Sequence, residues 1–241
     1  MNSLTNQEFL KAILNSFNRF IDSGTSRSTD KLKPLHGAIA RDIAERLGTE
    51  YIVKSQGYGD DKEAKIDGRY VDKAVDITIL KRSTLKPVAG IAVKFVMQNY
   101  SQNSNNYFEN MLGETANIRT ANIPYFQVFI ILDKIPYYKD KGEFKKWEEF
   151  TAHNFEKYIR LSHDDIDAFY HTPNKTLIVA VHVSPDIENL KNKKQYLDFY
   201  RENIPTIIFS ENKYEPQKGG SVIINDYELF MDKVYHTIMA I

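Results

Sequence analysis

The chain has 241 residues, of which 42% are hydrophobic, and its 32 basic and 32 acidic residues give a formal net charge of zero. This length predicts one domain with a sizeable core, and the charge balance argues against a polybasic or polyacidic tail. A nucleic-acid partner stays open, because a neutral chain can separate its charges onto different faces. The lack of cysteine excludes disulfides and thiolate metal sites. No segment is typical of a signal peptide or a membrane span, so we expect a cytoplasmic protein without a membrane partner.

The first part of the chain predicts two helices followed by an antiparallel meander. Thr5 and Glu8 have capping-box spacing, and the apolar residues after them recur at helical steps. Period-two patterns then predict strands and a hairpin that turns at Asp67-Gly68. The expected helices cover about 6–23 and 34–47, and the expected strands cover about 51–53, 65–70, 75–80 and 88–96.

The second part predicts buried strands that alternate with helices. The runs 126–132 and 177–183 are almost entirely apolar, as in strands buried on both faces, and 206–209 is a third candidate. Helices are expected at about 106–118, 149–160, 164–170 and 185–200. The fold class is therefore α/β, of a mixed α+β kind, with a central mixed sheet, an antiparallel meander and flanking helices.

Two charged residues interrupt or end apolar strands of the meander. Asp76 interrupts the run 74–77, and Lys94 closes the run 91–94. If the two strands pair, both side chains project together at one end of the sheet. A carboxylate and an ammonium group there can bind a divalent cation and orient a water molecule for attack on phosphorus. The alternative is a surface salt bridge between two strands.

The order helix, strand with Asp76, strand ending in Lys94, helix and strand resembles the core of PD-(D/E)xK nucleases. The segment 93–117, which contains VKFVMQNY and NNYFENMLGETAN, is similar to a family of type II restriction endonucleases. The resemblance covers about 34–132. It implies that 1–241 is a single nuclease domain of restriction-endonuclease-like fold, in which 133–241 completes the sheet and contributes dimer or DNA contacts.

One position departs from this family's pattern, because Ala92 stands where the family has Glu or Asp. Three explanations are open. The missing acid comes from the following helix, position 92 carries an engineered Glu→Ala change, or the domain is a nuclease relic that only binds. Helical geometry favours Glu109 over Glu114 as the replacement, since small residues share its flank. Glu45 of the second helix is a further candidate, and for all three acids the alternative is an ordinary solvated helix position.

The resemblance implies that Asp76 and Glu109 hold Mg²⁺ and that Lys94 activates the attacking water, so that Asp76, Lys94 and Glu109 are the catalytic residues. It also implies a prokaryotic homodimer that cuts double-stranded DNA at a palindromic sequence. Amides and lysines are candidates for DNA contacts, although both are also common in solvated loops. They are Gln98, Asn99, Asn103, Asn105, Asn106, Lys139 and Lys141, with Arg27, Lys31 and Lys33 as further phosphate contacts.

Two other functions stay open on the same fold: a catalytically silent DNA-binding or interaction module, and a DNA-repair or junction-resolving nuclease. No pair of histidines has the spacing of a zinc-binding helix, and no phosphate-binding lysine motif is present. A nucleotide cofactor is therefore not expected.

Overall fold

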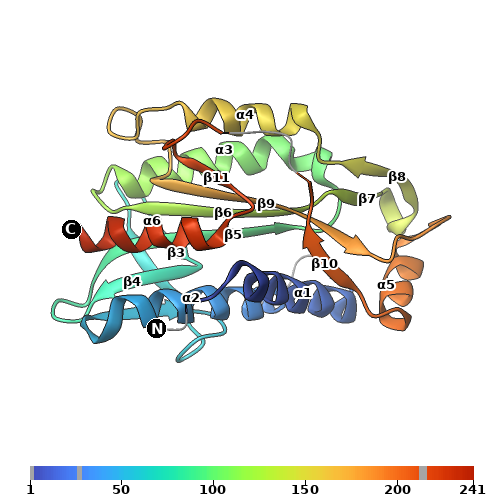
Figure 1. The fold of residues 1–241 in the computed structure, drawn as a ribbon, viewed down its shortest axis with the longest axis horizontal. Helices are drawn as coiled ribbons and strands as arrows, with labels where there is room; N and C mark the ends of the chain where they lie inside the picture. The colour runs from blue at the N-terminus through green and yellow to red at the C-terminus, as the bar shows by residue number, and fades with distance from the viewer. Residues whose placement is uncertain (1–2, 26–28, 212–215) are drawn as a thin grey trace.

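A curled mixed sheet runs through the computed structural model, which describes residues 3–25, 29–211 and 216–241 (Figure 1). Its strands pair in the order β1-β4-β5-β6-β9-β10, and β11 pairs with β9 on the same edge as β10. The strands are β1 (Tyr51–Ser55), β4 (Ile77–Lys81), β5 (Lys86–Val96), β6 (Tyr125–Leu132), β9 (Lys175–Ser184), β10 (Thr206–Phe209) and β11 (Val222–Ile224).

The predicted meander is confirmed as β1, β4 and β5, which pair antiparallel. Between β1 and β4 the chain makes a separate hairpin of β2 (Ala64–Asp67) and β3 (Asp72–Val75). Asp67 pairs with Asp72, so a hairpin forms at the predicted place, but its connection is 68–71 and not a two-residue turn at Asp67-Gly68. This hairpin leads directly into β4 and so fixes the position of the residue between them.

The predicted buried strands are confirmed in the centre of the sheet. Strand β6 lies parallel to both β5 and β9, and all eight of its residues are buried. Almost every residue of β6 is apolar because helices cover both faces of the sheet, so neither face is exposed to solvent. The segment after 132 completes the sheet through β9, β10 and β11.

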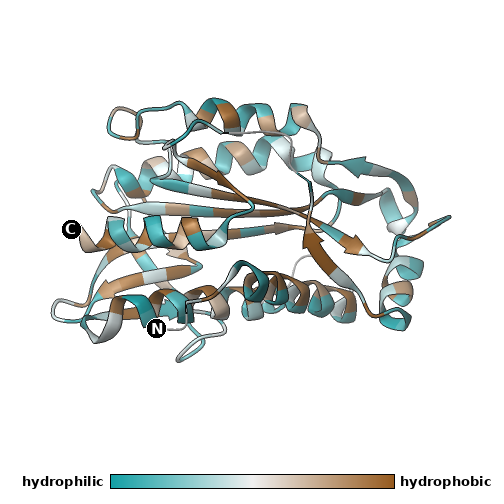
Figure 2. Cartoon of the chain, viewed as in Figure 1, coloured by the Kyte–Doolittle hydropathy of each residue, from teal (hydrophilic) through white to brown (hydrophobic). Residues whose placement is uncertain are grey.

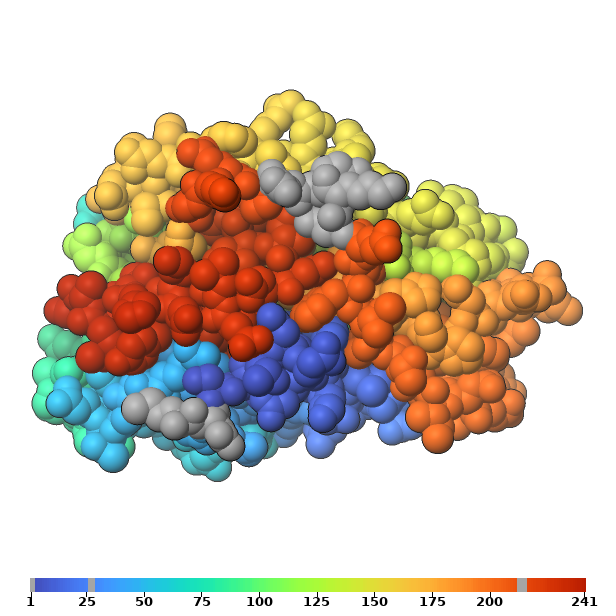
Figure 3. Space-filling view, in the orientation of Figure 1, coloured from blue at the N-terminus to red at the C-terminus, as the bar shows by residue number. Residues whose placement is uncertain are grey.

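Helices cover both faces of the sheet, with α1, α2 and α6 on one side and α3 and α4 on the other (Figure 1). Their apolar sides face the strands (Figure 2). The capping box of Thr5 and Glu8 is present at the start of α1, and α1 and α6 lie side by side on one face of the molecule (Figure 3). The helices are α1 (Asn6–Ser23), α2 (Lys33–Leu47), α3 (Tyr100–Arg119), α4 (Ala152–Ser162), α5 (Lys193–Glu202) and α6 (Tyr227–Met239). None of the described helices combines the length and apolar character that a membrane crossing requires.

The amide-rich segment 98–106, expected as a loop, forms the beginning of α3. The helix starts at Tyr100, whose buried ring packs edge-on against Phe150. The carboxylate of Glu148 accepts hydrogen bonds from the backbone and hydroxyl groups of Ser101, where the positive end of a helix favours a negative charge. The first turn of α3 is therefore stabilised by Glu148, which lies 47 positions from Ser101 in the sequence.

The lysine- and aromatic-rich segment after 133, expected as a loop, is a second hairpin of β7 (Lys134–Tyr138) and β8 (Phe144–Glu149). Glu148 lies on β8, so the same hairpin supplies the acid that caps α3. Short 3-10 turns complete the described elements: η1 (Asp30–Leu32), η2 (Gly48–Glu50) and η3 (Asp140–Gly142).

The helix expected at 164–170 is absent from this described stretch, which is a series of turns. The guanidinium group of Arg119 donates to the carbonyl oxygens of Ile166, Phe169 and Thr172 and so stabilises these turns, and of the three a helix over 164–170 would use only the carbonyl of Ile166. The helix expected from 185 starts only at Lys193, because the side chain of Asn192 caps it by accepting from Gln195 N–H. The sequence patterns at 222–224 and 227–239 did not predict β11 or α6.

Candidate active site

The break between β3 and β4 places Asp76 beside β5. Only Asp76 separates Val75 from Ile77, and its backbone carbonyl accepts a 2.7 Å hydrogen bond from the hydroxyl of Ser55. Its Oδ2 accepts a hydrogen bond of 2.7 Å from the backbone N–H of Val93. The carboxylate is thereby fixed against the strand that ends in Lys94.

Asp76 and Lys94 open into one cleft of about 320 Å³. Ala92 and Lys94 project from the same face of β5, and in register beside them lie Gln127 and Phe129 of β6. Helix α3 forms the opposite wall with Glu114. The sequence-based expectation that Asp76 and Lys94 lie together therefore agrees with the geometry.

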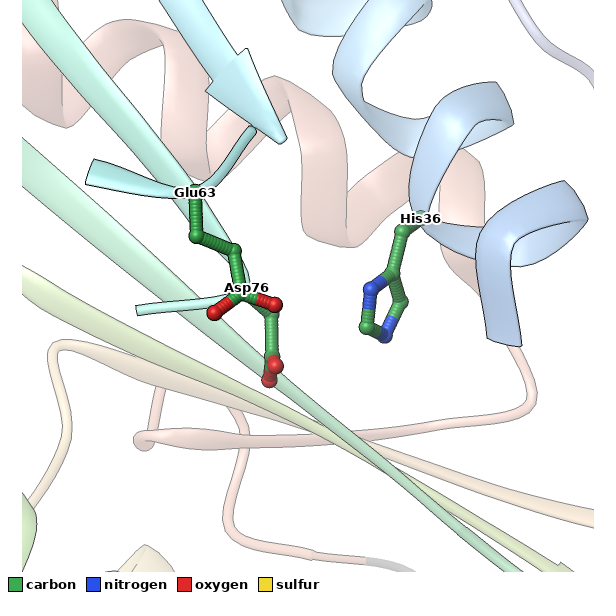
Figure 4. Close-up of side chains that lie close together, drawn as sticks. All are labelled: His36, Glu63 and Asp76. Carbon is green, nitrogen blue, oxygen red and sulfur yellow. The ribbon is translucent and has the colours of Figure 1, made fainter. Parts of the chain in front are cut away.

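Two further side chains from separate elements lie close to Asp76. His36 projects from α2, and Glu63 immediately precedes β2. One ligand atom of each of His36, Glu63 and Asp76 lies within 4.8 Å of the others, and Figure 4 shows the ring facing the two carboxylates. This group of one imidazole and two carboxylates could hold a metal ion.

A close backbone contact sets the position of His36. A Cβ atom at Gly37 would lie 2.2 Å from the carbonyl oxygen of Gly57, so only glycine lets α2 approach the loop after β1 this closely. Gly57 has a φ of 77°, a conformation that glycine adopts without strain. The pair brings His36 next to the chain that carries Glu63.

The electrostatics of this group are those of a carboxylate pair without a cation. Burial, and then the charge of Glu114, raise the pKa of Asp76 to about 6 against the opposing effects of Val93 N–H, Lys73 and Lys94. Burial and the charge of Asp76 raise the pKa of Glu63. Burial lowers the pKa of His36 to about 4, so its ring is neutral at pH 7. A neutral imidazole is the form that binds metals.

The structure places Glu114 at the cleft, where Glu109 was expected. Glu114 lines the cleft, 2.5 Å from the ammonium group of Lys73. Glu109 is exposed, lies outside the described lining of the cleft and faces Lys157. The buried face of α3 carries Met111 and Thr115, and this packing, rather than the small neighbours of Glu109, decides which acid faces the sheet.

Glu45 is also exposed and is not among the described residues that line the cleft. It lies nine positions after His36, more than two helical turns further along α2. The second helix therefore contributes His36, and not Glu45, to the neighbourhood of Asp76.

The candidate DNA contacts lie outside the described lining of the cleft. Asn99 is bound to the backbone of Tyr138 by two hydrogen bonds, so its amide has a structural role. Their other positions are as follows: Gln98 and Asn103 are half-buried, Asn105 and Asn106 are exposed on α3, Lys139 pairs with Glu143, and Lys141 is exposed on η3. Lys31 is buried and Lys33 pairs with Asp30 and Asp61, whereas Arg27 lies outside the described residues.

Sequence reasoning missed His36, Glu63 and Gln127. Gln127 is 6% exposed and lines the cleft, and its amide nitrogen has no hydrogen-bond partner within the described part of the chain. A single polar residue inside the apolar strand β6 was a usable signal. His36 and Glu63 carried no comparable signal, because they meet Asp76 only through tertiary contacts.

Comparison with known proteins adds no family assignment. No family model matches the chain, and neither a curated protein nor a solved structure matches it. The chemistry of the cleft therefore carries the functional assignment.

Proposed function

We propose that the chain is a metal-dependent nuclease that hydrolyses phosphodiester bonds of double-stranded DNA. The observation that carries this proposal is that Asp76 and Lys94 line one cleft, and that Asp76 also lies close to Glu63 and His36. Half-buried acids with raised pKa values near a lysine in a concave site are typical of catalytic centres. The curled mixed sheet with helices on both faces supports a restriction-endonuclease-like fold.

A bound divalent cation would neutralise charge on the scissile phosphate and lower the pKa of a coordinated water molecule. Asp76 and Glu63 supply carboxylate oxygens, the ligands that Mg²⁺ prefers. The exposed ammonium group of Lys94 lies 4.7 Å from the ring centre of Tyr107, which holds it at the mouth of the cleft. There it positions the attacking water and stabilises charge on the phosphate.

In the proposed reaction the water oxygen bonds to phosphorus while the bond to the 3′ oxygen breaks. The products are a 5′-phosphate and a 3′-hydroxyl, as the resemblance to type II restriction endonucleases implies. Gln127 lines the cleft, and its buried amide nitrogen has no partner among the described residues, so a small change of its side chain would let it donate to a phosphate oxygen. Cleavage at a palindromic sequence by a homodimer is the finer form of the proposal.

Ala92 does not remove the acidic character of the cleft. Glu63 and Glu114 both lie near Asp76, and they are better placed than Glu109 to supply the second carboxylate. This favours an acid contributed from another element over a disabled site. One observation favours the alternative function, a silent DNA-binding module. Position 92, which lies beside Gln127 on the neighbouring strand, is an alanine and cannot bind a metal.

The test is to incubate long phage DNA and Mg²⁺ or Mn²⁺ with the unmodified protein, with Asp76→Asn or with Ala92→Glu. We expect discrete fragments from the unmodified protein and a cleavage rate at least about a hundredfold lower from Asp76→Asn. Cleavage by Ala92→Glu alone would show a disabled nuclease, and DNA binding without cleavage by either would favour the silent module. Cutting of branched but not linear DNA would favour a junction-resolving nuclease.

A further inference from the structure

The ring of His36 is buried without a hydrogen-bond partner. Its residue is 2% exposed, and within the described residues neither ring nitrogen has a donor or an acceptor. Leaving a buried polar group unpaired costs about 1–3 kcal/mol. Such a cost at an otherwise well-packed helix indicates a ligand that the ring is built to receive.

His182 offers the contrast within the same molecule. Its Nδ1 lies 3.1 Å from a carboxylate oxygen of Asp133, and its side chain is 29% exposed. Polar partners and solvent satisfy this ring, whereas the ring of His36 lies near the two acids without a hydrogen bond to any described residue. The Glu63 carboxylate accepts from Gln56, which leaves lone pairs for a second partner.

The separations suit a single ion. Metal–ligand distances of about 2.1 Å place two ligands of one ion at most about 4.2 Å apart. Three neighbouring ligands of a tetrahedral or octahedral ion lie about 3.0–3.4 Å apart, and the three ligand atoms lie within 4.8 Å of one another, so the cluster has to contract by up to about 2 Å. Two carboxylates and a neutral ring also match the charge of a divalent cation.

The nitrogen donor distinguishes between divalent ions. Mg²⁺ takes oxygen ligands almost exclusively and keeps several waters, whereas imidazole suits first-row transition ions, and Mn²⁺ accepts both oxygen and nitrogen. We propose that His36, Glu63 and Asp76 together bind one transition-metal ion, with Mn²⁺ preferred over Mg²⁺ and His36 as a direct ligand. The role of this ion rests on the proposed function, since the ion would act in the same reaction through Asp76. Its binding can be tested without DNA.

The first test is calorimetric titration of the intact chain with Mn²⁺ and with Mg²⁺. We expect one Mn²⁺ site at least about tenfold tighter than the Mg²⁺ site, and His36→Ala should weaken Mn²⁺ by about 10–100-fold and Mg²⁺ by much less. His182→Ala is the matched control and should leave both affinities unchanged. Equal weakening of the two ions in His36→Ala, or none, would overturn the proposal.

The second test needs no variant and so does not depend on the folding of one. Pulsed electron paramagnetic resonance of the protein with one equivalent of Mn²⁺ should show the hyperfine coupling of a ¹⁴N ligand. A spectrum without ¹⁴N coupling would overturn a direct His36 ligand. Mn²⁺ binding with ¹⁴N coupling but no DNA cleavage would keep this inference and remove the nuclease, whereas cleavage without ¹⁴N coupling would do the reverse.

Discussion

Two aspartates in this molecule, the buried Asp42 and the half-buried Asp76, have opposite surroundings. Asp42 of α2 is 3% exposed, and its carboxylate accepts from Leu4 N–H at 3.1 Å, Arg46 Nε at 3.0 Å and the Tyr227 hydroxyl at 2.8 Å. Asp76 accepts from Val93 N–H at 2.7 Å, and its other neighbours include acids. The first carboxylate joins three elements of the fold, and the second is available to a ligand. Satisfied polar groups indicate structure, and unsatisfied ones indicate binding.

The largest expected effect comes from Asp42→Ala. The change leaves the guanidinium of Arg46, whose side chain is 10% exposed, with Asp232 as its remaining ion-pair partner among the described residues, and it removes the acceptor of the Tyr227 hydroxyl. Breaking a buried pair in this way should cost about 3–5 kcal/mol of the free energy of unfolding. Urea denaturation measures it, and a loss below about 1 kcal/mol would contradict a structural role for Asp42.

Asp76→Asn should change stability in the other direction. The pKa of Asp76 is about 6 in the folded protein and 3.8 as a free side chain, so its charged form is disfavoured by folding. At pH 7 the variant should be as stable as the wild type or more stable, by up to about 3 kcal/mol. Metal binding should be lost. Marked destabilisation of Asp76→Asn in metal-free buffer would place Asp76 in the same class as Asp42.

His36→Gln should reveal a cancellation of two pH effects. A folded pKa of about 4 against 6.5 means that His36 adds stability above pH 6.5, and this contribution is lost as the pH falls through 4. Asp76 acts oppositely over about pH 4–6, and the raised pKa of Glu63 acts with Asp76.

We therefore expect the stability of the metal-free wild type to change less with pH over about pH 4–6 than that of either variant. Over the same range His36→Gln should lose about 3 kcal/mol as the pH rises, and Asp76→Asn should gain a similar amount. Urea midpoints at several pH values give the slopes. Parallel slopes in all three proteins would show that the two groups do not titrate as the cleft requires.

The smallest expected effect is that of Tyr227→Phe. The variant keeps the ring, which stacks on Phe9 at 4.1 Å, and removes only the hydroxyl that donates to Asp42. A cost of about 1–3 kcal/mol is expected because a buried acceptor loses a donor. Tyr235→Phe is the control, since its ring is only half-buried, and should be neutral. A neutral Tyr227→Phe would mean that Leu4 and Arg46 suffice for Asp42.

Local patterns predicted the parts of the fold and site that depend on neighbours in sequence. The alternation around Asp76 and Lys94 was enough to place Lys94 on β5 and Asp76 next to the strand that pairs with it, although Asp76 itself lies in the break between β3 and β4. The start of α3 was not predictable locally, because it depends on Glu148 of a distant hairpin. The convergence of His36 and Glu63 depends on the contact of Gly37 with Gly57, which no periodicity encodes.

The contact between the first and last helices bears on when the cleft comes into existence during synthesis. The side chain of Asn6 accepts hydrogen bonds from the backbone N–H groups of Tyr227 and Glu228, and Asp42 accepts one from the Tyr227 hydroxyl. Helix α6 therefore stabilises the positions of both α1 and α2 (Figure 3). Because α2 carries His36, a nascent chain still lacking α6 holds this helix through α1 and β1 but without the hydrogen bond from Tyr227 to Asp42. The strands of the site are therefore made before the last of these supports for the helix that carries His36.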